Sequence, residues 1–185
     1  MSAALLIIDI QNDYFPGGTM TLVGPDAAAA QAAKLLAAFR AKKLMVFHVQ
    51  HLSVRPGATF FLPDTKGAEI HERVRPLAGE ALIQKNFPNA FRETKLLEQL
   101  RAAKVDKLVI AGMMTHMCVD TSTRAAADLG FACSLAHDAC ATKELVFNGA
   151  KVAAEQVQLS YLAGLNGAFA KVQSAEELCA ADAAQ

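Results

Sequence analysis

The chain has 185 residues, a formal net charge of +0 and 53% hydrophobic residues. The length predicts a single domain, residues 1–185, that can bury a core without disulfides or metals, and the balanced charge excludes the basic surface that usually binds DNA, RNA or anionic membranes. The apolar stretches are short and interrupted by charges, so no membrane-spanning helix is expected.

Four cysteines are present, and the first residues lack the basic and then apolar pattern of a secretion signal. This usage favours a cytoplasmic protein with reduced thiols over a disulfide-stapled secreted domain. Because nothing points to nucleic acid or membrane, the expected partner is a small-molecule substrate.

The first predicted strand, residues 4–10, is apolar at every position except Asp9. A buried carboxylate needs a partner or a function, and parallel-sheet folds place their chemistry at the carboxyl ends of strands. Asp9 is therefore a candidate catalytic group, and the alternative is an aspartate that caps the next loop. That loop, residues 11–18, lacks the lysine and spacing of a phosphate-binding loop and is interpreted as a turn.

A helix is predicted from Pro25, with apolar residues repeating along one face, and a strand over residues 44–49 follows it. This is a strand–helix–strand unit. His48 and His51 lie three residues apart at the end of the strand, which raises the question of metal binding. No third ligand is adjacent, so hydrogen bonding is the favoured interpretation.

Residues 53–88 lack helical periodicity, which predicts a long irregular segment with a short helical turn near residues 69–74. Long loops often form the walls or lids of functional sites. Phe60 and Phe61 are candidates either to line an apolar pocket or to pack beneath the loop.

Lys85 ends a third short apolar run, residues 81–84. If its ammonium lies beside Asp9 and a thiol at neighbouring strand ends, it stabilises both anions. The alternative is a surface lysine at a turn.

A cysteine lies between the next strand, residues 107–111, and an alanine-rich helix over residues 121–129. Thr115 is expected to cap the helix by bonding the backbone N–H of Cys118, and the helix dipole to lower the pKa of that thiol. A thiolate so placed is a nucleophile. A buried structural cysteine is the alternative.

The chain continues to alternate after the cysteine helix. A strand is predicted over residues 131–136, and Asp138 beyond it is expected to act in a turn. Apolar residues between 147 and 165 recur at helical spacing, which predicts a helix facing the core.

The last predicted elements are a strand over residues 168–172 and a short helix capped by Ser174, with acidic residues in its first turn. The tail after Asp182 is expected to fray.

Alternating strands and helices predict an α/β fold, a three-layer α/β/α arrangement around a doubly wound, mainly parallel sheet of about six strands. Ligands bind such sheets at the carboxyl ends of the strands. Asp9, Lys85 and Cys118 all fall at predicted strand ends, and together they favour a catalytic site over three unrelated structural roles.

Three segments carry a resemblance to a known family: Leu-Ile-Ile-Asp-Ile-Gln-Asn-Asp-Tyr at 6–14, the strand ending at Lys85 with Asn-Ala-Phe at 89–91, and Ala-Gly-Met-Met-Thr-His-Met-Cys-Val at 111–119. Over roughly residues 3–172 the chain resembles the cysteine hydrolases of the isochorismatase-like superfamily, which includes nicotinamidases, N-carbamoylsarcosine amidohydrolases and streptothricin hydrolase. The segment around the cysteine is most similar to streptothricin hydrolase.

The resemblance implies a role for each of the three residues: Asp9 is the general base, Lys85 holds and polarises the pair, and Cys118 is the nucleophile. It also implies a cis peptide bond between Met113 and Met114, with an oxyanion hole formed by the backbone N–H groups of Met114 and Cys118. The candidate pocket residues are Gln11, Tyr14, Phe60, Phe91 and His116.

The implied reaction is hydrolysis of a C–N bond in a small amide, lactam or ureido compound through a thioester. Nicotinamidases hold a metal with an Asp-x-His arrangement and a further histidine that residues 49–53 do not reproduce, so neither nicotinamide as substrate nor a metal or other cofactor is expected. Isochorismatases proper lack the cysteine, so Cys118 argues against vinyl-ether cleavage. A homodimer or larger homo-oligomer is implied.

Two alternatives stay open. One is a redox-responsive protein in which Cys118 is oxidised reversibly and Cys140 is the resolving thiol. The other is a member of this fold that acts on a non-amide substrate or serves only as a binding or structural subunit. The intact set of Asp9, Lys85 and Cys118 argues against an idle member.

Overall fold

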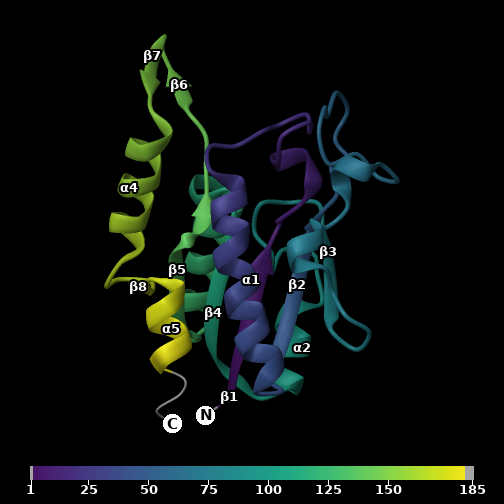
Figure 1. Ribbon diagram of the computed structural model, residues 1–185, viewed down its shortest axis with the longest axis vertical. Helices are drawn as coiled ribbons and strands as arrows, with labels where there is room; N and C mark the ends of the chain where they lie inside the picture. Colours follow the sequence, from purple (N-terminus) through teal and green to yellow (C-terminus); the bar gives the residue numbers. More distant parts are fainter. Residues whose placement is uncertain (1, 182–185) are drawn as a thin grey trace.

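A parallel six-stranded sheet runs through the centre of the computed structural model, which describes residues 2–181 (Figure 1). Its strands stand in the order β3-β2-β1-β4-β5-β8, and each neighbouring pair is parallel. Their bounds are β1 Ser2–Ile8, β2 Met45–His51, β3 Ala81–Lys85, β4 Val105–Met113, β5 Ala132–Ala141 and β8 Lys171–Gln173.

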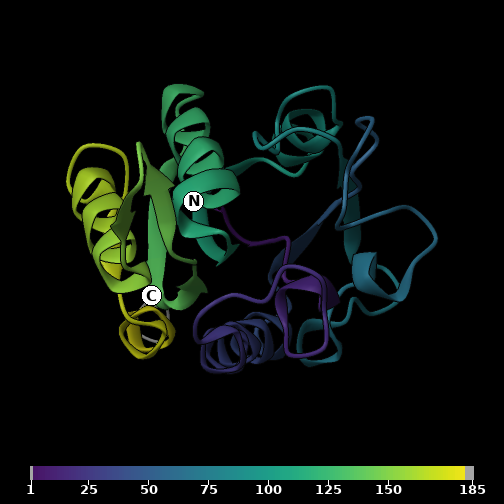
Figure 2. The same cartoon turned by 90° about the horizontal axis from the view of Figure 1, so that it is seen from above.

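Helices cover both faces of the sheet, which confirms the predicted three-layer α/β/α fold. Figure 2 shows α1 and α5 on one side and α2 and α3 on the other, and α4 lies beside α3 and contacts β8. The helices are α1 Pro25–Ala41, α2 Leu96–Ala102, α3 Asp120–Asp128, α4 Ala154–Leu165 and α5 Ala175–Ala181.

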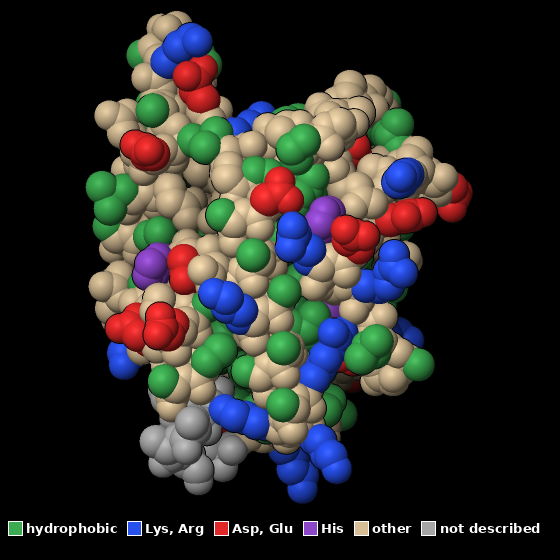
Figure 3. Space-filling view, viewed as in Figure 1, with side chains coloured by type: hydrophobic (Ala, Val, Ile, Leu, Met, Phe, Trp, Pro, Cys, Tyr) green, Lys and Arg blue, Asp and Glu red, His purple; other side chains and the backbone are tan. Residues whose placement is uncertain are grey.

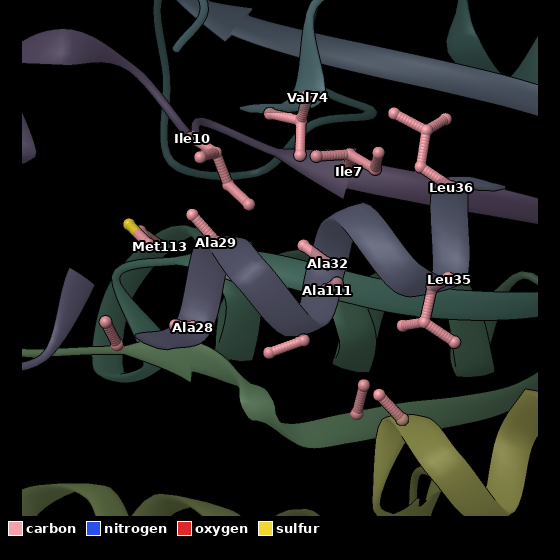
Figure 4. Close-up of a cluster of buried hydrophobic side chains, with 14 of the residues drawn as sticks. Ile7, Ile10, Ala28, Ala29, Ala32, Leu35, Leu36, Val74, Ala111 and Met113 are labelled. Carbon is pink, nitrogen blue, oxygen red and sulfur yellow. The ribbon is translucent and has the colours of Figure 1, made fainter. Parts of the chain in front are cut away.

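Strand β1 is buried on both faces because its side chains alternate between the two helical layers. Leu5 and Ile7 pack in the cluster that contains the α1 residues, whereas Leu6 packs in the cluster that contains α2 and α3 residues. On the α1 side, small side chains let the helix approach the sheet closely (Figure 4). These small residues are Ala28, Ala29 and Ala32.

Strands β1 and β4 approach each other closely at Gly112. A Cβ atom at this position would overlap the carbonyl oxygen of Ile8, and the φ of 149° is one that residues with side chains rarely adopt. The glycine therefore lets the ends of β1 and β4 lie side by side, directly before Asp9 and the segment that carries Cys118.

Strand β5 is longer than the sequence pattern predicted, since it continues from residue 136 to Ala141. The pairing with β4 shifts between Ile110 and Gly112, which face Leu135 and Cys140, so the extra length is accommodated in an irregular stretch of β5. Asp138 lies there, and its Oδ1 accepts a hydrogen bond from Ala175 N at 2.8 Å. Its expected turn role is wrong, because the carboxylate instead meets the first turn of α5.

The segment before α4 is a hairpin and not the start of the predicted helix. β6 (Leu145–Phe147) and β7 (Ala150–Val152) pair antiparallel around Asn148 and Gly149, which both have positive φ. An Asn-Gly pair in this conformation makes a tight hairpin turn, which overrides the helical spacing of the apolar residues. Phe147, expected in the core, is 77% exposed.

Short 3-10 turns interrupt the long irregular segments: η1 Asn12–Tyr14, η2 Lys66–Ala68 and η3 Glu72–Val74. The last lies within the predicted turn. The cap of α5 is also as predicted, because Ser174 Oγ accepts from Glu177 N while Glu177 Oε2 accepts from Ser174 N. The tail after Asp182 lies outside the described residues.

The visible surface carries both signs of charge, in keeping with the formal net charge of +0 (Figure 3). The hairpin of β6 and β7 rises above the body of the molecule in the same view as in Figure 1. None of the helices that the structure describes has the length and apolar character needed to cross a membrane.

Candidate active site

Asp9, Lys85 and Cys118 meet at the carboxyl edge of the sheet. Asp9 directly follows β1, Lys85 is the last residue of β3, and Cys118 lies in a π-helical turn, η4 (Thr115–Val119), after β4. The strand order reverses between β1 and β4, because later strands add outward on each side of this pair. Asp9 and Cys118 therefore flank the switch point, where open α/β sheets bind their ligands, and the side chain of Lys85 reaches them from β3.

The ammonium of Lys85 connects the site. Its Nζ lies 2.6 Å from Asp9 Oδ2, 3.4 Å from Cys118 Sγ and 2.9 Å from His51 Nδ1. An ammonium has three protons to donate, so these three contacts use its full capacity. Because the side chains of Asp9 and Lys85 are both fully buried, the ion pair is shielded from water.

Burial shifts the protonation of these groups. It raises the pKa of the Asp9 carboxyl, against the opposing charge of Lys85, which makes this carboxylate a stronger base than an ordinary aspartate. Burial opposes the charge on Lys85, but Asp9 and Cys118 outweigh it and the pKa of the ammonium is raised.

The thiol of Cys118 holds its proton in this environment, because burial and then the charge of Asp9 raise its pKa. The prediction that the helix would lower this pKa is wrong. Thr115 does not cap the helix either, since its Oγ1 donates to Ala141 O at 3.2 Å. Helix α3 begins only at Asp120, so Cys118 lies before its first turn.

A cavity of about 350 Å³ opens beside the thiol. Cys118 and Met114 both line it, and the Met113–Met114 peptide bond is cis. Tyr14 and Phe60 form part of its wall, with their ring centroids 6.2 Å apart. Phe61 is buried beneath them and packs edge-on against Tyr14 at 4.6 Å. The thiol thus borders a space that fits a small molecule, and the buried Asp9 and Lys85 lie behind it, in contact through Lys85 Nζ.

The Isochorismatase domain matches residues 3–177 of the sequence. The chain belongs to the isochorismatase family. It is 49% identical over 176 residues to YddQ, an isochorismatase family protein of Bacillus subtilis, covering 95% of this chain and 98% of that protein. It is 35% identical over 144 residues to streptothricin hydrolase of Streptomyces noursei, covering 77% of this chain and 50% of that protein.

A solved structure from Oleispira antarctica, assigned to the isochorismatase hydrolases, has the same fold with a TM-score of 0.93. The two chains are 51% identical, and the match covers 97% of this chain and 96% of the other. The protein is therefore an isochorismatase-family hydrolase.

Three of the predicted pocket residues of this isochorismatase-family protein lie away from the cavity lining. Gln11 bridges two segments, donating to His51 O and Ala68 O. The ring of Phe91 lies 6.2 Å from that of Phe131. His116 Nδ1 contacts Thr142 Oγ1 at 2.5 Å, and its ring faces α4.

His51 also contacts the site of this isochorismatase-family protein, which the sequence alone did not indicate. It faces Lys85 in the register of β2 and β3, a pairing that becomes visible only when the two strands are placed side by side. Burial, with the charges of Lys85 and Arg55, lowers the pKa of His51 to about 3, so the ring is neutral. His48, by contrast, contacts Glu80 at 2.9 Å and does not reach this site.

Asp9, His51 and Cys118 each offer one potential metal ligand, and the three ligand atoms lie within 4.8 Å of one another. Each of them is also in contact with Lys85 Nζ. The ammonium therefore supplies positive charge to the same three side chains that could hold a metal ion.

Proposed function

We propose that the protein is a cysteine-dependent hydrolase that cleaves a C–N bond of a small amide, lactam or ureido compound. The observation that carries the proposal is the position of Lys85 Nζ, which lies within hydrogen-bond distance of Asp9 Oδ2 and close to Cys118 Sγ, while Cys118 borders the cavity. An acid–base group, a fixed cation and a nucleophile are the parts that acyl transfer requires.

In the first half of the reaction, the carboxylate of Asp9 takes the proton of the Cys118 thiol as the sulfur attacks the substrate carbonyl carbon. The oxyanion accepts hydrogen bonds from the backbone N–H groups of Met114 and Cys118. Asp9 then gives the proton to the nitrogen as the C–N bond breaks. Ammonia or an amine departs from an open-chain amide or ureido compound, whereas the amine of an opened lactam stays attached to the acyl group.

In the second half, Asp9 takes a proton from water, which attacks the thioester carbonyl. The C–S bond breaks, the proton passes to the sulfur, and the product leaves as a carboxylic acid, or as a carbamic acid when the substrate is a ureido compound. Lys85 keeps its protons throughout, because Asp9 and Cys118 raise the pKa of its ammonium. It stabilises whichever partner, Asp9 or Cys118, carries the negative charge at each step.

The similarity to streptothricin hydrolase supports a hydrolytic reaction. The proposal needs no cofactor, and it describes residues 1–185 as one domain that acts in the cytoplasm as a homodimer or larger homo-oligomer. The exposed Phe147 and Leu159, on the hairpin and α4, are apolar residues that such self-association would cover.

A reversible redox role is less well supported. Cys140 lies within β5, and burial raises the pKa of its thiol to about 12. A resolving thiol works best when it is accessible and easily ionised, and Cys140 is neither.

The proposal is tested by screening small amides, lactams and ureido compounds for release of ammonia or amine. Cys118→Ala is expected to abolish turnover while its thermal unfolding stays close to that of the wild type. Cys133→Ala removes another buried thiol, outside the site, and keeps turnover. Undiminished release by Cys118→Ala rejects the proposal.

A further inference from the structure

The cavity beside Cys118 carries one charged side chain that the proposed reaction does not use. Among the described residues that line this cavity, Arg55 is the one whose side chain carries a formal charge. Its guanidinium forms no ion pair or hydrogen bond with any of the residues 2–181 that the structure describes. Five donors on a permanent cation thus border the space where the substrate must sit.

The polar groups around Arg55 leave its charge uncompensated. His51 is neutral, because its pKa is lowered to about 3. Burial and nearby negative charges raise the pKa of the Tyr14 phenol, so this group is also neutral. The positive charge of Lys85 is matched by Asp9. Arg55 therefore supplies the net positive charge among the side chains that line the cavity, and such a charge attracts anions.

The segment that carries Arg55 is anchored at both ends. Ser53 N donates to Phe61 O at 2.8 Å, which closes the loop on itself. Phe61 N donates to Asp13 Oδ2 at 2.6 Å, which ties the loop to the segment after β1. Arg55 lies within this anchored loop, and because it is solvent-exposed and also lines the cavity, it lies at the mouth of the cavity.

We propose that Arg55 binds an anionic group of the substrate, so that the preferred substrate is a small amide that also carries a carboxylate. That the substrate is an amide rests on the proposed function, whereas the anion site rests only on the position of Arg55 beside the cavity. A guanidinium matches a carboxylate with two parallel hydrogen bonds, and the cavity of about 350 Å³ limits the ligand to a small acid.

Alkylation of Cys118 tests the anion site without requiring turnover. Iodoacetate carries a negatively charged carboxylate next to the reacting carbon, whereas iodoacetamide carries a neutral amide at the same place. The rate constant of each with Cys118 is measured by peptide mass mapping, and the ratio of the two is divided by the same ratio for glutathione. The normalised ratio is expected to favour iodoacetate in the wild type and to fall about tenfold in Arg55→Gln, as expected on loss of one charge-assisted contact.

Two further variants sharpen the result. Arg55→Lys keeps the charge but not the paired geometry, so an intermediate ratio is expected. Arg101→Gln removes an exposed arginine on α2, away from the cavity, and leaves the ratio unchanged. A ratio that is the same in Arg55→Gln and in the wild type overturns the anion site.

A matched pair of substrates then separates the anion site from the proposed function. Succinamate and its neutral methyl ester both carry a primary amide, and ammonia release is compared for each. A higher kcat/KM for succinamate, lost in Arg55→Gln, supports the substrate class. If ammonia is released from neither compound nor from any amide of the screen, while the alkylation ratio still falls in Arg55→Gln, the hydrolase proposal fails and the anion site stands.

Discussion

Lys85 Nζ lies 2.9 Å from Nδ1 of His51, so the lysine that pairs with Asp9 is also held by the strand between them. An ammonium can only donate, and Nδ1 therefore accepts and the ring proton lies on Nε2. His51 is thus a positioning residue for Lys85, and it borders the cavity as a neutral ring.

His51→Leu is expected to lower the free energy of unfolding by about 1–3 kcal/mol, because the buried ammonium loses one of its three acceptors. His51→Asn keeps an acceptor oxygen near the position of Nδ1 and is expected to lose less. Urea unfolding of both variants measures the difference. Equal stability of the Leu variant and the wild type contradicts the assigned contact.

Lys85→Met is expected to lower the free energy of unfolding by about 3–5 kcal/mol at pH 8, because it leaves the buried carboxylate of Asp9 without a partner. Burial raises the folded pKa of Asp9 above its unfolded value, and loss of Lys85 raises it further. A raised carboxyl pKa gives a stability contribution that is present at low pH and lost as the pH rises through the folded pKa. The deficit relative to the wild type is therefore smaller at pH 5 than at pH 8.

The double variant Asp9→Asn/Lys85→Met is the control, since it removes both charges. It is expected to recover most of the stability that Lys85→Met loses at pH 8, and denaturant titrations at the two pH values complete the cycle. A deficit that is independent of pH shows that the loss comes from packing and not from an unpaired carboxylate.

The pH profile of kcat/KM is expected to have an acid limb set by Asp9, with a midpoint above the ordinary aspartate value of 3.8 because burial raises this pKa. His51 contributes no limb near neutrality, since its pKa is lowered to about 3. The limb should persist in His51→Asn. If that variant loses the acid limb, a titrating histidine and not Asp9 controls it.

Gly112→Ala is expected to destabilise the fold by about 2 kcal/mol more than Gly130→Ala. Both glycines have positive φ, but the new Cβ at 112 meets the Ile8 carbonyl whereas the one at 130 meets nothing within 4 Å. Comparing the thermal unfolding of the two variants separates the effect of the atomic overlap at residue 112 from the cost of a side chain at positive φ, which both variants share. Similar losses in the two variants are the contradictory result.

Much of the fold could be predicted because its signals are local. The helix expected from Pro25 begins at that residue, and the strands around Asp9 and Cys118 coincide with continuous apolar runs. Burial on both faces of a strand and on one face of a helix leaves a repeating pattern in the sequence. The same reasoning grouped Asp9, Lys85 and Cys118, since all parallel strands end at one edge.

The missed features depend on contacts between distant segments. His51 and Lys85 are 34 residues apart in the chain, and only the order of the strands shows that they touch. The pKa of the Cys118 thiol follows from its burial and from Asp9 and not from its place near a helix. The Asn-Gly turn at 148–149 was a local signal for a hairpin, and helical spacing obscured it.

The cation among Asp9, His51 and Cys118 is the tip of a lysine side chain, covalently bound to the polypeptide. A divalent ion at such a place has a dissociation constant, competes with chelators and depends on supply. The charge of Lys85 has none of these properties. The charge is a permanent part of the polypeptide, so neither dilution nor dialysis removes it.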